Sequence, residues 1–202
     1  MKTVGALLFP GFELLDVFGP LEMFGALPDD YRIAVIAEHA GAIESNQGPK
    51  AIAEFAFADA TPCDLLLVPG GLGTRREVEN KTLIEWLRQR AEASPLVATV
   101  CTGAALLART GLLDQRKATT NKAAFRWVMT QGPHVLWQRK ARWVVDGKYF
   151  TSSGVSAGMD MALDLIAHLS GPEQAQQAAT YAEYRWSRDP DDDPFSDLYD
   201  LG

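Results

Sequence analysis

The sequence contains few of the features that mark extracellular, metal-binding or nucleic-acid-binding proteins. Its 202 residues include two cysteines, Cys63 and Cys101, which are too few for a disulfide framework or a zinc site and fit a reducing compartment. Lysine and arginine total 19 against 26 aspartates and glutamates, a balance that argues against a nucleic-acid-binding surface. We therefore expect no metal, no other cofactor and no nucleic-acid partner.

Long hydrophobic runs are also missing. No apolar stretch approaches membrane-spanning length, and residues 1–10 lack the layout of a signal peptide, so we expect no membrane association and a cytoplasmic location. A hydrophobic content of 47% is ordinary for a globular chain. The length fits one α/β domain, residues 1–202, with an acidic tail from about 189 to 202 that we interpret as solvated.

The stretch from 96 to 113 organises the rest of the interpretation. Residues 96–100 form a short apolar run typical of a buried strand, and residues 104–113, mostly alanine and leucine, favour a buried helix. Cys101 lies at the junction, where a sharp turn would present its side chain at the carboxyl edge of a sheet. The helix N-terminus is expected to lower the pKa of this thiol. The alternative is a buried core cysteine.

Strands and helices alternate along the chain, which predicts a doubly wound, mostly parallel sheet between layers of helices. The expected strands are 4–9, 32–37, 65–68, 96–100, 117–120 and 150–153, with short edge strands within 41–53 and a hairpin over 137–149. The expected helices are 13–27 (kinked or broken at Gly19-Pro20), 82–93, 104–113, 122–130, 156–169 and 172–188.

Two further features are predicted near strand carboxyl ends, where ligands bind in such sheets. Asp16 lies within the apolar helix after the first strand, and a buried carboxylate is costly unless it is paired or protonated. The alternative is that Asp16 faces solvent or caps the helix. Gly70 and Gly71 follow the strand 65–68, where their N–H groups can approach a ligand, although a tight turn also explains them. The expected convergence of Asp16, Gly70 and Gly71 with Cys101 favours a catalytic site.

The three histidines do not provide a partner for Cys101. His39 follows a strand close to Gly41, His134 lies in a Gly-Pro loop, and His168 lies in an apolar helix. We therefore interpret each of them as a surface residue or a satisfied core residue.

Five motifs in order resemble the ThiJ/PfpI family, over about residues 3–170. They are Phe9-Pro10-Gly11-Phe12, Leu15-Asp16-Val17-Phe18-Gly19-Pro20, Val68-Pro69-Gly70-Gly71, Val100-Cys101-Thr102-Gly103 and Ser153-Gly154-Val155-Ser156-Ala157-Gly158. The resemblance implies a flavodoxin-like sandwich of the class I glutamine-amidotransferase-like superfamily, with a nucleophile elbow at Cys101. It also implies a homodimer.

Within this family the residues are most similar to those of isonitrile hydratases and of sensor-like domains fused to helix-turn-helix regulators. Cys101, Thr102 and Asp16 match the Cys-Thr elbow and the acidic residue of the hydratases. Thr102 stands where protease-like members carry histidine, and Asn121 follows two threonines where related members often carry histidine. Ser153 lies where amidotransferases carry a histidine after the last strand.

The resemblance implies an enzyme that adds water to an isonitrile, a small-molecule substrate, to give an N-substituted formamide. Cys101 would be the nucleophile, Asp16 the proton donor with a raised pKa, and Thr102 the residue that orients water or substrate. The oxyanion and substrate-binding part of the site is expected to contain Gly70, Gly71, Asn121 and Ser153.

Two other functions remain open on the same residues. One is attack of the Cys101 thiolate on a reactive carbonyl such as a glyoxal. The other is a non-catalytic sensor of small molecules or oxidants, in which Cys101 is oxidised to a sulfinate that Asp16 hydrogen-bonds.

Overall fold

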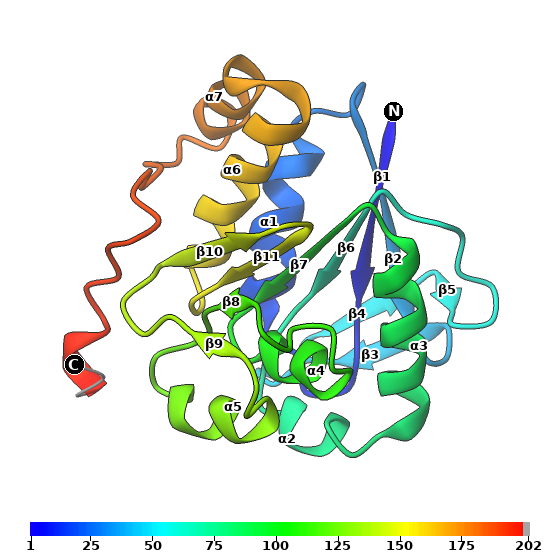
Figure 1. The fold of residues 1–202 in the computed structure, drawn as a ribbon. Helices are drawn as coiled ribbons and strands as arrows, with labels where there is room; N and C mark the ends of the chain where they lie inside the picture. The colour runs from blue at the N-terminus through cyan, green and yellow to red at the C-terminus, as the bar shows by residue number, and fades with distance from the viewer. Residues whose placement is uncertain (200–202) are drawn as a thin grey trace.

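Seven strands form the central sheet of the computed structural model, which describes residues 1–199 (Figure 1). They are β1 (Lys2–Leu7), β2 (Tyr31–Ala37), β5 (Phe55–Ala56), β6 (Leu65–Val68), β7 (Leu96–Val100), β10 (Trp143–Asp146) and β11 (Tyr149–Ser152). The order across the sheet is β10-β11-β7-β6-β1-β2-β5, and every neighbouring pair is parallel except β10 with β11. The predicted mostly parallel α/β fold is confirmed.

Helices cover both faces of this sheet, which explains why its middle strand β6 is apolar throughout and why β7 and β11 on the same side are almost wholly buried. The helices are α1 (Leu14–Gly25), α2 (Thr74–Glu77), α3 (Lys81–Ala93), α4 (Gly103–Arg109), α5 (Phe125–Gln131), α6 (Ala157–Ser170) and α7 (Pro172–Tyr181), followed by a 3-10 turn, Asp197–Tyr199. In Figure 1, α1, α6 and α7 pack together on one face, while α3 and α4 cover the other with α2 and α5 against α4. Across residues 1–199, none of these helices has the length and apolar character needed to cross a membrane.

Two small sheets lie outside the central one. The strands β3 (Gly41–Glu44) and β4 (Lys50–Ala53) form an antiparallel pair in the region where short edge strands were expected. The strand β8 (Lys117–Ala118) pairs with β9 (Leu136–Trp137), so the predicted hairpin is too long at its start. The true hairpin is β10 and β11, joined through Gly147, whose φ of +61° suits glycine.

Several helix boundaries differ from the prediction. Helix α1 is continuous through Pro20, which removes only one backbone donor, and an added Cβ on Gly19 would lie 2.9 Å from Met159 Cγ. This close packing of α1 against α6 supports a single helix. Helix α4 ends at Arg109 rather than near 113 because Gly111 adopts a left-handed φ of +81°. Helix α7 ends at Tyr181 rather than at 188.

The acidic tail is bound to the rest of the fold, so its interpretation as solvated is wrong in part. Asp193 is only 2% exposed, its N–H donates to Lys140 O at 3.0 Å, and Arg142 N–H donates to Pro190 O at 2.7 Å. In Figure 1 the tail runs from α7 past the β10 edge of the sheet. The tail prediction also included residues 200–202, which lie outside the described residues.

A buried aspartate on α6 holds the segment between α7 and this tail. Asp160 is fully buried and accepts hydrogen bonds from Arg142 Nε at 2.7 Å, Tyr184 Oη at 3.1 Å and Ser187 N at 2.9 Å. A charge of this kind is tolerated inside a protein only when it is paired and hydrogen-bonded. Asp160 therefore joins β10, α6 and the chain that leaves α7.

We expect Asp160→Ala to lower the free energy of unfolding by about 3 to 5 kcal/mol, because it leaves the Arg142 guanidinium buried without its anion. Urea denaturation measures this change. The matched control is Asp164→Ala, one turn along α6, where only the bond from Trp143 Nε1 at 3.1 Å is lost and the expected cost is about 1 kcal/mol. Equal losses in the two variants would contradict the anchoring role of Asp160.

Candidate active site

The carboxyl ends of four adjacent strands bring the predicted site residues together. Gly70 follows β6, Cys101 follows β7, Ser153 follows β11, and Asp16 lies on α1 after β1. Gly70 N–H donates to Asp16 Oδ2 at 2.9 Å, and Cys101 N–H donates to Ser153 O at 3.2 Å. The Asp16 contact spans β1 and β6, where the strand order reverses and where such sheets bind ligands.

The backbone turns sharply at Cys101, as predicted. Its φ is +56°, in the left-handed region that residues other than glycine seldom occupy. The Cys101 carbonyl accepts the Thr120 hydroxyl at 2.7 Å, which fixes the turn. Helix α4 begins two residues later at Gly103, where an added Cβ would lie 2.7 Å from Pro69 O. Only glycine permits this approach of β7 and α4 to the loop after β6.

Asp16 is fully buried, so it does not face solvent. Its Oδ2 accepts Gly70 N–H, and α1 has no side-chain cap, so it does not cap its own helix either. Burial raises the pKa of its carboxyl to about 8, and the hydrogen bond from Gly70 N–H opposes this shift. Among the described residues, Asp16 Oδ1 has no hydrogen-bond partner. The expected rise in the Asp16 pKa is confirmed, and the group is protonated at neutral pH.

The expected lowering of the Cys101 pKa by the helix N-terminus is wrong. Burial, and secondly the charge of ionised Asp16, raise the pKa of this thiol well above its ordinary value of 9.0. The N–H and hydroxyl of Thr102 act in the opposite direction but do not compensate. Burial counts for more because it removes nearly all solvent from a charge that the helix end only partly stabilises. At neutral pH the pair consists of a thiol and a carboxylic acid.

Exposure does not separate the two cysteines, since each is 6% exposed. Their surroundings do. Cys63 Sγ lies 3.4 Å from Ser94 Oγ, beneath β1, where an added Cβ on Gly5 would be 3.1 Å away. Cys101 has the Asp16 carboxyl as a polar neighbour. Cys101 is therefore as buried as a core cysteine, but it lies beside an ionisable group.

Thr102 belongs to a short chain of buried polar groups. Gly71 N–H donates to Thr102 Oγ1 at 3.0 Å, and Thr74 Oγ1 donates to Gly71 O at 2.7 Å and lies 3.1 Å from Thr102 Oγ1. The Gly71 N–H, expected at an oxyanion site, therefore holds the Thr102 hydroxyl. Thr74 was not identified from the sequence, although its position three residues after Gly71 is typical of a turn-closing hydroxyl.

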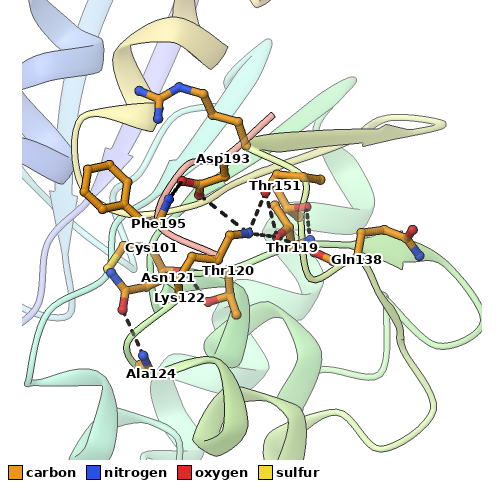
Figure 2. A network of polar contacts seen from close by, with 12 residues as sticks. Cys101, Thr119, Thr120, Asn121, Lys122, Ala124, Gln138, Thr151, Asp193 and Phe195 are labelled. Atoms are coloured by element: carbon orange, nitrogen blue, oxygen red, sulfur yellow. Dashed lines mark hydrogen bonds and ion pairs between the residues drawn. The ribbon is translucent and has the colours of Figure 1, made fainter. Parts of the chain in front are cut away.

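Asn121 lies beside the Cys101 sulfur. Its Oδ1 accepts Ala124 N–H at 2.9 Å, and Figure 2 shows the amide nitrogen turned towards Cys101. Gly154 lies against both side chains, because an added Cβ there would collide with Asn121 Nδ2 and lie 3.0 Å from Cys101 Sγ. Ser153 is buried, and its backbone rather than its hydroxyl makes the contact with Cys101.

Two charged residues near the thiol were not identified from the sequence. The Glu13 carboxylate contributes to the raised pKa of both Asp16 and Cys101. The Arg75 guanidinium stacks 3.5 Å from the ring centroid of Trp127 and is close enough to interact with the charge of Cys101. Within residues 1–199, no group of three or more histidine, cysteine, aspartate or glutamate side chains could hold a metal ion.

Comparison with known proteins identifies similar chains. Residues 2–168 match the DJ-1/PfpI family. The isonitrile hydratase of Pseudomonas putida is 33% identical over 90% of this chain and 78% of its own length. The HTH-type transcriptional regulator CdhR of Pseudomonas aeruginosa is 30% identical over 86% of this chain. The match spans 52% of the regulator, about half of its length.

Solved structures have the same fold. A ThiJ/PfpI family protein from Pseudomonas syringae superposes with a TM-score of 0.80 at 26% identity, over 92% of this chain and 76% of its own. A DJ-1 superfamily protein from Salmonella typhimurium, solved as a cysteine-to-alanine mutant, gives 0.79 at 24% identity, over 92% of this chain and all of its own.

We expect an alkylating agent such as iodoacetamide to modify Cys101 before Cys63, because Cys101 lies next to Asn121 and Gly154, which line a cavity, whereas Cys63 lies under β1. The labelling rate of Cys101, measured by peptide mass spectrometry from pH 7 to 10, should still be rising at the highest pH. In Asp16→Asn the labelling rate of Cys101 from pH 8 to 10 should be higher than in the wild type, since no carboxylate then opposes the thiolate. Faster labelling of Cys63, or unchanged Cys101 rates in Asp16→Asn, would contradict this assignment.

Proposed function

The chain belongs to the DJ-1/PfpI family, and on this premise we propose that it is a cysteine-dependent enzyme that adds water to an isonitrile to give an N-substituted formamide. The observation that carries the proposal is the buried Asp16 carboxyl beside the Cys101 thiol, with a pKa of about 8. An isonitrile carbon needs a nucleophile and a proton at the same atom, and this pair supplies both. The 33% identity to an isonitrile hydratase supports this substrate class.

In the proposed first step, Cys101 Sγ forms a bond to the isonitrile carbon. That carbon takes a proton from the Asp16 carboxyl, and the thiol proton passes to the Asp16 carboxylate. The product is a thioimidate, in which the sulfur and one hydrogen have been added to the carbon. The neutral pair at pH 7 suits this exchange, because no separated charge has to be formed in a buried site.

In the second step, water attacks the thioimidate carbon and the C–S bond breaks. The sulfur leaves as a thiol with one proton from the water, the substrate nitrogen takes the other proton, and the carbon keeps the oxygen as the formamide. The Thr102 N–H acts on the sulfur at the first turn of α4, so it is the donor that we assign to developing negative charge. The Thr102 hydroxyl, held by Gly71 and Thr74, orients the water.

Asn121 and Gly70 have supporting roles in this proposal. The Asn121 amide nitrogen faces the sulfur and can donate to the substrate nitrogen as it gains a proton. Gly70 N–H accounts for the orientation of Asp16, because it binds Oδ2 and leaves Oδ1 for the transferred proton. Ser153 acts through its backbone, which holds the Cys101 turn.

An oxidant sensor is a second candidate function, favoured by one observation. Asp16 Oδ1 is buried without a partner among the described residues, and its protonated form can donate to an oxygen placed on the Cys101 sulfur. The 30% identity to a transcriptional regulator is consistent with this. Mass spectrometry after mild peroxide separates the candidates: a stable sulfinate without isonitrile turnover favours the sensor. Turnover of a glyoxal alone favours the carbonyl reaction.

We expect Asp16→Asn to reduce turnover of cyclohexyl isocyanide by about two to four orders of magnitude, since an amide cannot transfer the proton. Cys101→Ala should abolish turnover, and Cys63→Ala, a cysteine outside the site, should retain it. The formamide product is followed by NMR. Full activity in Asp16→Asn would overturn the acid role.

The same variant also changes the pH dependence of stability. In the unfolded chain the Asp16 carboxyl ionises near 3.8, whereas in the folded chain it stays protonated up to about 8. Folded wild-type protein therefore loses stability as the pH rises through this window. Asp16→Asn lacks this loss, so its Tm should exceed that of the wild type at pH 7 and approach it at pH 4.

We also propose a homodimer that meets through α1, in a cytoplasmic setting that fits the two free cysteines. Leu15 and Phe18 are 41% and 47% exposed on this helix, and apolar exposure of this kind favours association. Light scattering should give twice the mass of 22.1 kDa. Phe18→Glu should give the single mass, whereas Ile52→Glu, on an exposed strand elsewhere, should not.

A further inference from the structure

The last described residues of the chain lie close to the site, and a buried ion pair holds them there. We propose that residues 193–199 form one wall of the substrate pocket, that the pair between Lys122 and Asp193 positions this wall, and that Phe195 and Tyr199 select substrates with an apolar substituent. This inference rests on the proposed function, because it assumes that the reacting group of the substrate is bound at Cys101.

A cavity of about 280 Å³ lies between the tail and the site. Asn121 and Gly154, which flank the Cys101 sulfur, line it at one side. Leu15, Phe195 and Tyr199 give it an apolar part. The volume lies just below the usual range for small-molecule pockets. A compound with a small polar head and a compact apolar body therefore fits, with the head beside the sulfur.

The ion pair connects the tail to the residue next to Asn121. Lys122 Nζ lies 3.6 Å from Asp193 Oδ2, and the two side chains are 1% and 0% exposed. Lys122 Nζ also donates to Thr119 Oγ1 at 2.9 Å and to Ala141 O at 2.5 Å (Figure 2). Because a charge this deeply buried requires a partner of opposite sign, the pair ties the tail to one position.

Asp193 transmits this constraint to the pocket wall. Its Oδ1 accepts Phe195 N–H at 3.1 Å, and its carbonyl accepts Ser196 N–H at 3.0 Å. This turn places Phe195 in the lining of the cavity, although its side chain is still about half exposed. Neither Asp193 nor Lys122 lies against the sulfur, so both are positioning residues. The residues that touch the substrate body are Phe195 and Tyr199.

The wall is tested by the size preference of thiol labelling, which does not depend on turnover. The readout is the ratio of the Cys101 labelling rate constants for N-benzyl iodoacetamide and iodoacetamide. We expect a ratio above that of free cysteine in the wild type and a fall of about tenfold in Phe195→Ala and in Tyr199→Ala. The control is Leu198→Ala, which is 71% exposed and does not line the cavity. Equal ratios in all four proteins would overturn the wall.

The tether is tested with Asp193→Asn, which removes the charge and retains the acceptor for Phe195 N–H. We expect hydrogen exchange in residues 193–199 to speed up at least tenfold and the labelling ratio to fall as in Phe195→Ala. Asp192→Asn, the exposed neighbour, should change neither. Unchanged exchange and an unchanged ratio in Asp193→Asn would refute the positioning role. If this variant fails to fold, the two wall variants still decide the pocket.

These measurements separate the inference from the reaction. If the wall variants lose the labelling preference but the wild-type protein turns over no isonitrile, the proposal that residues 193–199 line the pocket is supported and the proposed hydratase reaction is rejected. If the protein turns over isonitriles but Phe195→Ala has the wild-type KM for both methyl and cyclohexyl isocyanide, the reaction is supported and the role of residues 193–199 as a pocket wall is rejected. If both hold, Phe195→Ala raises the KM about tenfold for cyclohexyl isocyanide alone.

Discussion

The hydrogen bond from Gly70 N–H to Asp16 Oδ2 joins the segments after β1 and β6 at the point where the sheet reverses its strand order. This contact requires glycine at 70, because an added Cβ would lie 2.5 Å from Thr102 N and 2.9 Å from Asp16 Oδ2. One backbone donor orients the carboxyl without ionising it. Further donors would stabilise the carboxylate and lower its pKa, and the neutral acid beside the thiol would be lost.

Strand positions and the meeting of Asp16, Gly70 and Cys101 could be predicted because they depend on local sequence and on simple topology. The runs 65–68 and 96–100 agree with β6 and β7 to the residue, since both strands are buried apart from the first residue of β7 and each is followed by residues that turn the chain. Parallel strands end at one edge of the sheet, so residues that follow them converge without any knowledge of side-chain packing.

The electrostatics and the tail could not be predicted in the same way. The pKa of Cys101 depends on how much solvent the completed fold removes, and the helix end visible in the sequence is the weaker effect. Asp193 lies in a run of acidic residues that is typical of a solvated end, and its burial depends on a partner that is distant in sequence, Lys122. Trp137 pairs with β8 for a similar reason. Each of these results depends on a tertiary partner rather than on a local pattern.

The left-handed backbone of Cys101 has a consequence for the history and engineering of such a chain. A side chain at φ +56° costs on the order of 1 to 3 kcal/mol, and glycine at 101 would relieve most of that cost. Selection for expression or heat resistance alone would therefore enrich variants that have lost the sulfur. A laboratory evolution scheme on this scaffold must select for thiol chemistry in every round, because the backbone angle that the thiol requires at residue 101 lowers the stability of the fold.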